Sequence, residues 1–148
     1  MPNAIYADRA SGQVYADARA MVDAYISRLA ERSGGAIEPL DASGYTQLRS
    51  GSASVAINVL EDHGVLLILA PVMKVPVVGR EALYQRLLEL SFIATSDAAF
   101  SIDRSKGEVY VRTLRRLSGL DYEEFEDLVT TVGKVADEWD DALAAEFP

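Results

Sequence analysis

Hydrophobic residues recur every three or four positions in three stretches of the chain, which is the spacing of one face of an α-helix. These stretches are about 12–33, then 80–94, and a long one that follows Asp121 and holds its apolar face for about six turns. Asp121 is of the N-cap type, and Glu124 stands where the acid of a capping box belongs. The sequence therefore predicts three helices.

Apolar and polar residues alternate in other stretches, as in a strand with one buried face. The pattern is clear at 52–60 and in two arms of a hairpin, 98–102 and 109–112, and it is weak at 36–40 and 45–49. The sequence thus predicts a run of strands between the first two helices and a hairpin before the third.

The run 65–70 is apolar at every position, which predicts a central strand covered on both faces. Pro71 and Pro76 then favour an extended segment over 71–78 and disfavour a central position in a sheet.

The expected order is α-β-β-β-α-β-β-α, in which strands outnumber the helices that could cross between them. We therefore predict an α+β fold, with an antiparallel sheet and helices packed against it. At 148 residues and without an evident linker, the chain fits one domain over 12–148, preceded by a flexible arm over 1–11.

The second helix is apolar over most of its circumference, which indicates burial on more than one side. The second side is either the interior of the same domain or a partner subunit. We expect a homodimer whose interface includes Leu83, Tyr84, Leu87 and Leu90.

Charge is distributed unevenly. The formal net charge is −9, and residues 121–148 hold ten acids and one lysine, so the final helix carries the whole excess. This acidity is either a solvated helix face or a guide for a basic partner, and it argues against direct nucleic-acid binding. Five bases cluster around the hairpin, and they either dock an acidic partner or offset the acidic helix: Arg104, Lys106, Arg112, Arg115 and Arg116.

Catalytic chemistry has few candidates in this chain. There is no cysteine, His63 is the only histidine, and no nucleotide-binding or nucleophile motif occurs. Asp137 and Asp141 share the exposed side of the final helix, where nothing predicts a raised pKa. We expect no enzyme activity, no metal and no cofactor.

The N-terminal residues lack the basic and apolar regions of a signal peptide, and the longest apolar run, 65–73, is too short to span a bilayer. We expect a cytoplasmic protein that does not bind membranes.

The segment LLELSFIATSDAAFSIDRSKGEVYVRTLRRLSGLDYEEFEDLVTTVGKVADEW carries a family resemblance. Its leucine-rich helix, phenylalanine-containing hairpin with a glycine turn, Gly-Leu lead-in and final helix resemble the YbjN family and the type III secretion chaperone-like (CesT/Tir) fold. The resemblance covers about 12–147. It implies a twisted antiparallel sheet, a homodimer, no catalytic residues and, as in secretion chaperones, apolar surface that holds an extended client segment.

We therefore predict a dimeric, chaperone-like protein-binding module, with the partner or client on apolar surface that includes Leu66, Ile68, Val75 and Val77. One alternative is a YbjN-type regulator that acts on one specific folded protein. Another is a small-ligand-binding protein whose pocket under the sheet uses polar groups of Tyr45, Tyr84, Tyr110 or His63.

Overall fold

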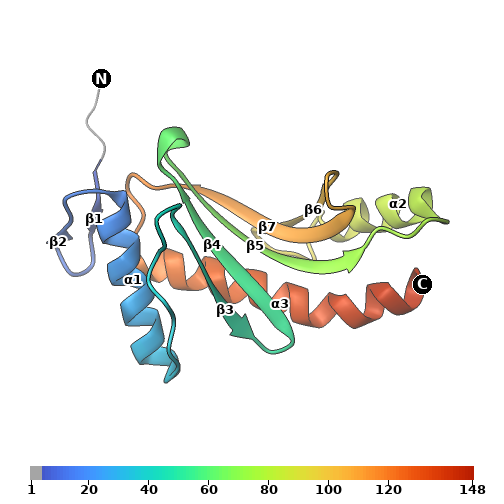
Figure 1. Cartoon of the computed structure of the whole chain (residues 1–148), viewed down its shortest axis with the longest axis horizontal. Coiled ribbons are helices and arrows are strands. Elements are labelled where there is room, and N and C mark those ends of the chain that lie inside the picture. Colours follow the sequence, from blue (N-terminus) through green and yellow to red (C-terminus); the bar gives the residue numbers. More distant parts are fainter. Residues whose placement is uncertain (1–4) are drawn as a thin grey trace.

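A computed structural model of the chain describes residues 5–148 (Figure 1). Its helices and strands, in chain order, are β1 (Ala7–Asp8), β2 (Gln13–Val14), α1 (Ala18–Ser33), β3 (Tyr45–Ser50), β4 (Ala53–Leu60), a 3₁₀ turn η1 (Glu61–His63), β5 (Val65–Lys74), α2 (Arg80–Leu90), β6 (Ala99–Asp103), β7 (Glu108–Arg116) and α3 (Tyr122–Glu146).

Five strands form one antiparallel sheet in the order β3-β4-β5-β7-β6, while β1 and β2 pair separately. This confirms the predicted α+β class and, apart from the small β1–β2 pair, the predicted order of elements.

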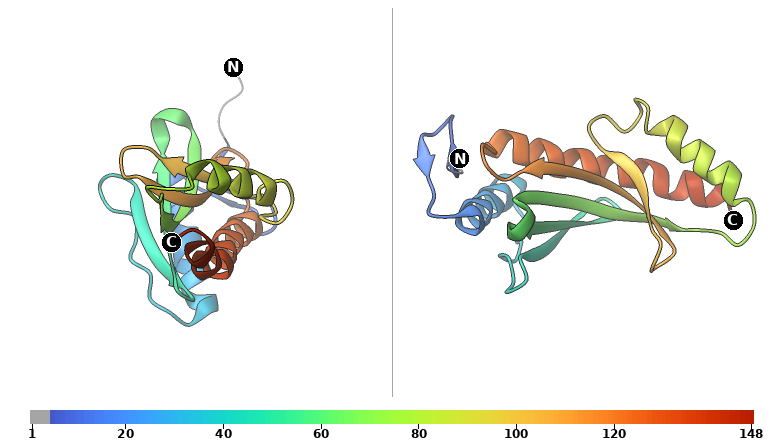
Figure 2. Two further views of the ribbon diagram at one scale, coloured as in Figure 1. Left: turned by 90° about the vertical axis from the view of Figure 1, so that its right-hand side faces the viewer. Right: turned by 90° about the horizontal axis from the view of Figure 1, so that it is seen from above.

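The helix α3 runs along one face of the sheet, and α1 and α2 lie near its two ends (Figures 1 and 2). The helix α3 contacts β3, β4, β5 and β7. The buried side chains of the sheet face it, among them Val55, Ile57, Ile68 and Val111, and α3 contributes Phe125, Leu128, Val132 and Ala136 to the same core. No helix in the described part of the chain covers the opposite face, which we call the outer face.

The strand β5 is central in the sheet, but the prediction that both of its faces are covered is wrong. Leu66, Ile68 and Ala70 are buried, whereas Leu67 and Leu69 are only half-buried on the outer face. Successive side chains of a strand point to opposite faces, and only one face of this sheet has a helix against it.

Pro71 lies within β5 at a point where the sheet no longer has a strand on both sides. Pairing with β4 ends at Leu69 and Ala56, so Pro71 pairs only with Tyr110 of β7. The missing N–H of proline is tolerated there because β5 is locally an edge strand.

Two helix boundaries differ from the prediction. The first helix begins at Ala18, not near position 12, because Asp17 is its N-cap and accepts a hydrogen bond from the Ala20 amide at 2.8 Å. The second ends at Leu90 rather than at position 94. Residues 36–40 are not a strand; the Thr46 hydroxyl donates to the Glu38 carbonyl at 2.7 Å and holds this loop against β3.

The predicted flexible arm covers residues 1–11, of which 1–4 lie outside the described residues and 5–11 contact the start of α3. The backbone amide and Nε of Arg9 each donate to the Asp121 carboxylate at 2.9 Å. Asp8 accepts from the Tyr122 amide at 3.2 Å, so it supplies the side-chain cap of α3 that was expected from Asp121. The N-terminal segment is therefore fastened to the start of α3.

Candidate partner-binding site

The four residues predicted to bind a partner do not share one accessible surface. Leu66 and Ile68 are buried beneath α3, Val75 is half-buried against the core, and Val77 is 87% exposed in the segment before α2. Leu66 and Ile68 have almost no exposed surface, so the protomer offers neither side chain to a partner, contrary to the prediction. The alternation of the strand places Leu67 and Leu69 on the accessible face instead.

The predicted dimer residues on α2 are also mostly covered. Leu83, Leu87 and Leu90 are buried within the protomer, which leaves only Tyr84, 37% exposed, at the surface. This corrects the assignment of the leucine stripe to a subunit contact, because the domain itself already covers that stripe.

Three large apolar side chains of α2 and the turn after it are exposed. Leu88 is 75% exposed, Phe92 89% and Ile93 79%. The sequence predicted burial of this helix on more than one side; within the protomer the leucine stripe is buried, and Leu88, Phe92 and Ile93 are exposed.

Among the described residues, the edge strand β3 leaves some of its backbone groups without partners. Val59 donates to the Gly44 carbonyl at 2.8 Å, and in an antiparallel ladder alternate residues direct their backbone toward the neighbour. Tyr45, Gln47 and Arg49 therefore point their N–H and C=O groups away from β4. The Asp41 side chain and amide satisfy Tyr45, but within residues 5–148 no backbone group bonds those of Gln47 or Arg49 on this side.

An apolar hollow of about 410 Å³ lies beside this edge. Its lining comes from α1, the following loop, β3 and α3, and includes Leu29, Ile37, Leu48, Val129 and Thr130. We call the free edge at Gln47 and Arg49, together with this hollow, the edge groove. It offers main-chain pairing and a side-chain pocket at once, which are the two requirements for adding a strand.

Contacts between the β3–β4 turn and α3 fix one end of the edge groove. The Ser52 amide and hydroxyl both donate to Asp137, at 2.8 and 2.6 Å, and these bonds lower the pKa of Asp137. Asp137 thus accepts hydrogen bonds that join the β3–β4 turn to α3.

Other candidate chemistry is sparse. His63 lies in η1 beside a shallow polar hollow that also includes Arg19 and Asp62. Within residues 5–148 no three histidine or acidic side chains are grouped to hold a metal ion. No helix in that range is both long enough and apolar enough to cross a membrane.

Little in the sequence indicates the edge groove. β3 has only a weak strand pattern, and Leu29 and Ile37 lie on opposite sides of the glycines that end α1. The free edge follows from the strand order, which the sequence does not show.

The chain belongs to the Tir chaperone protein (CesT) family, whose model matches residues 25–140. No curated protein matches it.

Three solved structures share the fold at low identity. A chain of the ExsC–ExsE complex is 24% identical with a TM-score of 0.67, covering 82% of this chain and 92% of that one. For the HopA1–SchA chaperone–effector complex the identity is 10% and the TM-score 0.63, with 81% and 93% covered. For the ExoU–SpcU complex of the Pseudomonas aeruginosa type III secretion system, the identity is 16% and the TM-score 0.59, with 79% of this chain and 93% of that chain covered. The predicted resemblance to secretion chaperones is confirmed.

Proposed function

We propose that this protein is a non-enzymatic, chaperone-like module that binds an extended segment of a protein partner at the edge groove. Family membership supports a protein-binding role of this kind, and one of the matched structures is a chaperone–effector complex. The observation that carries the proposal is the free backbone of Gln47 and Arg49 beside an apolar hollow. A strand added there would pair with both residues and place alternate side chains against Leu48 and Val129.

We also propose that two copies associate through the open side of the α2 region. Leu88, Phe92 and Ile93 lie close together in sequence, and large apolar side chains this exposed commonly mark an interaction surface. Their position replaces the leucine stripe as the expected subunit contact. We further propose that the protein is cytoplasmic. The chain has no cysteine, so it forms no disulfide that would need an oxidising compartment.

The variant Arg49→Pro tests the edge groove. Proline removes a backbone N–H that points away from β4, so no ladder bond within the sheet is lost. Arg49→Ala is the matched control, because it removes the same side chain and keeps the N–H.

Tagged wild-type protein and both variants would be used to capture partners from lysate of the native cell. We expect the same protein to be retained by the wild type and by Arg49→Ala, and to be lost or strongly reduced with Arg49→Pro. Equal retention by all three would show that the partner does not pair with the β3 edge.

A further inference from the structure

A second surface, on the outer face of the sheet, has a different chemistry from the edge groove. Two adjoining hollows of about 230 and 300 Å³ share Leu67, Leu69, Lys106 and Tyr110. The first extends to Ser101 on β6 and the second to Tyr45 on β3, so together they cross the whole sheet. We call this continuous depression the outer trough.

The outer trough has an apolar floor and a polar rim. Leu67 and Leu69 of β5 form the centre of the floor, with Ala56 of β4 beside them. Tyr45 and Tyr110 stand toward its two sides and offer aromatic faces. Such a lining suits a chain that alternates apolar and polar side chains.

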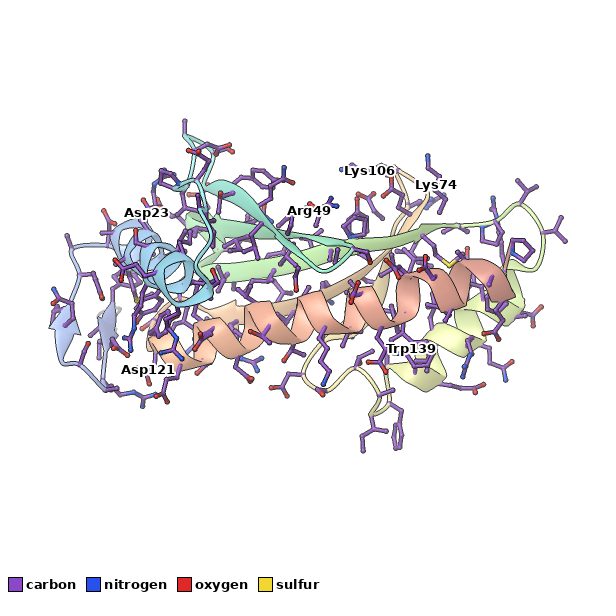
Figure 3. The ribbon with its side chains drawn as sticks, turned by 90° about the horizontal axis from the view of Figure 1, so that it is seen from below. Asp23, Arg49, Lys74, Lys106, Asp121 and Trp139 are labelled. Carbon is purple, nitrogen blue, oxygen red and sulfur yellow. The ribbon has the colours of Figure 1, made fainter. Side chains whose placement is uncertain are left out.

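The charges of the outer face are mostly positive. Arg49, Lys74 and Lys106 lie on the side of the sheet away from α3 (Figure 3). Arg112 lies between buried Val111 and Thr113, and Arg116 is four residues further along β7, so both belong to the outer face. None of these five bases forms an ion pair within residues 5–148.

Two acids share the outer face and leave the positive excess in place. Asp103 accepts from the Ser105 amide and hydroxyl at 2.9 and 2.6 Å, so its own turn occupies its carboxylate. Glu108 lies opposite Lys74 in the β5–β7 register.

Of the basic cluster seen in the sequence, Arg115 pairs with Glu124 and Asp97, at 3.3 and 3.4 Å, and so offsets the acidic helix. Lys106 and Arg112 form no ion pair with the acidic helix within residues 5–148, and both line the outer trough.

We propose that the outer trough binds an extended acidic segment of a protein partner, with aliphatic or aromatic residues between its carboxylates. Lys106 and Arg112 would pair with the carboxylates, and Leu67, Leu69 and the two tyrosines would take the apolar side chains. Five strands about 4.8 Å apart give room for roughly six extended residues across the sheet. The acidic face of α3 repels such a segment, so charge directs it to the outer face. This inference rests on the proposed protein-binding function but uses a different surface.

The test is fluorescence anisotropy with an eight-residue labelled peptide in which glutamate alternates with leucine and phenylalanine. The control peptide carries lysine in place of glutamate. We expect the wild-type protein to bind the acidic peptide, with affinity falling as salt rises, and to bind the lysine peptide at least about tenfold more weakly.

The protein variants locate the binding. Lys106→Glu and, separately, Arg112→Gln should each weaken the acidic peptide about tenfold. Lys134→Glu makes the same charge change on α3 and should alter affinity less than about twofold. Ile37 lies in the edge groove, so Ile37→Ala should leave the affinity for the acidic peptide unchanged. This variant therefore separates binding in the outer trough from binding in the edge groove.

Several results would overturn the inference. These are no measurable binding, equal affinity for the lysine peptide, or equal loss with Lys134→Glu. Loss with Ile37→Ala alone would place the peptide in the edge groove, which would leave the proposed function standing. If the wild-type protein self-associates and the Lys106→Glu variant does not, a second copy of the chain covers the outer trough.

Discussion

Asp8 joins segments that are far apart in the sequence. Its carboxylate accepts from the Ser11 hydroxyl at 2.7 Å and from the Tyr122 amide, and Arg28 lies 3.8 Å away. Burial alone would raise the pKa of Asp8, but the hydrogen bonds from Ser11 and Tyr122 outweigh it, so its pKa lies below the ordinary value of 3.8. The guanidinium of Arg9 likewise lowers the pKa of Asp121. The attachment of the N-terminal segment thus depends on two ionised carboxylates.

Acid should release this segment. A carboxylate whose pKa is lower in the folded state stabilises that state above its unfolded pKa, and the contribution disappears as pH falls through the folded value. We therefore expect hydrogen exchange of residues 5–14 to accelerate below about pH 4, after correction for the intrinsic rate. Asp8→Asn should show fast exchange already at neutral pH. Unchanged protection down to about pH 2 would contradict the role of these carboxylates.

Gly133 lies in the middle of α3, where glycine costs roughly 1 kcal/mol relative to alanine. Only glycine fits at this position, because a Cβ there would lie 2.5 Å from Oγ and 2.7 Å from Cβ of Ser50. The absence of a side chain lets α3 approach the end of β3.

Gly133→Ala should therefore destabilise the fold despite its better helix propensity. Overpacking typically costs about 1–3 kcal/mol, which exceeds the gain from propensity. Urea unfolding would measure the change, with Gly35→Ala as the control, since its nearest neighbour is 3.7 Å away. A more stable Gly133→Ala protein would show that α3 and β3 are less tightly packed than described.

At the scale of elements, periodicity predicted which segments become helices and strands, but not always which side of each is buried. The sequence placed Leu66 and Ile68 on a binding surface, although the alternation allowed either face of β5 to be open. The same holds for α2, whose leucine stripe was assigned to a partner. Which side is covered depends on where α3 lies, and this packing is not a local property of the sequence.

The two sides of the α2 region give opposite expectations for one kind of substitution. Leu88→Asp changes an exposed side chain, so we expect a folded monomer of 16.1 kDa from the variant and, under the proposed interface, a dimer from the wild type. Leu87→Asp buries a charge within the protomer and should cost several kcal/mol, leaving little folded protein. Sedimentation and circular dichroism would distinguish the two outcomes, with Glu81→Ala as the control. A folded Leu88→Asp dimer would rule out this interface.

For the whole molecule, strand order and charge separation determine the surfaces that a partner can reach. The acidic helix α3 covers one face of the sheet and β3 leaves one edge open (Figures 2 and 3). The other face carries bases that form no ion pair within residues 5–148. The sequence predicted the acidic helix and the basic hairpin separately. It could not show that the sheet lies between them, or that β3 rather than another strand forms an open edge.

The most direct test of the account is amide exchange by NMR on the protein alone and in complex with a captured partner. If the partner adds a strand to β3, the Gln47 and Arg49 amides should exchange at least about tenfold more slowly in the complex. The neighbouring Thr46 and Leu48 amides already bond β4 and should change little. Slower exchange confined to α2 or the outer face, with Gln47 and Arg49 unaffected, would contradict the central claim that the edge groove holds the partner.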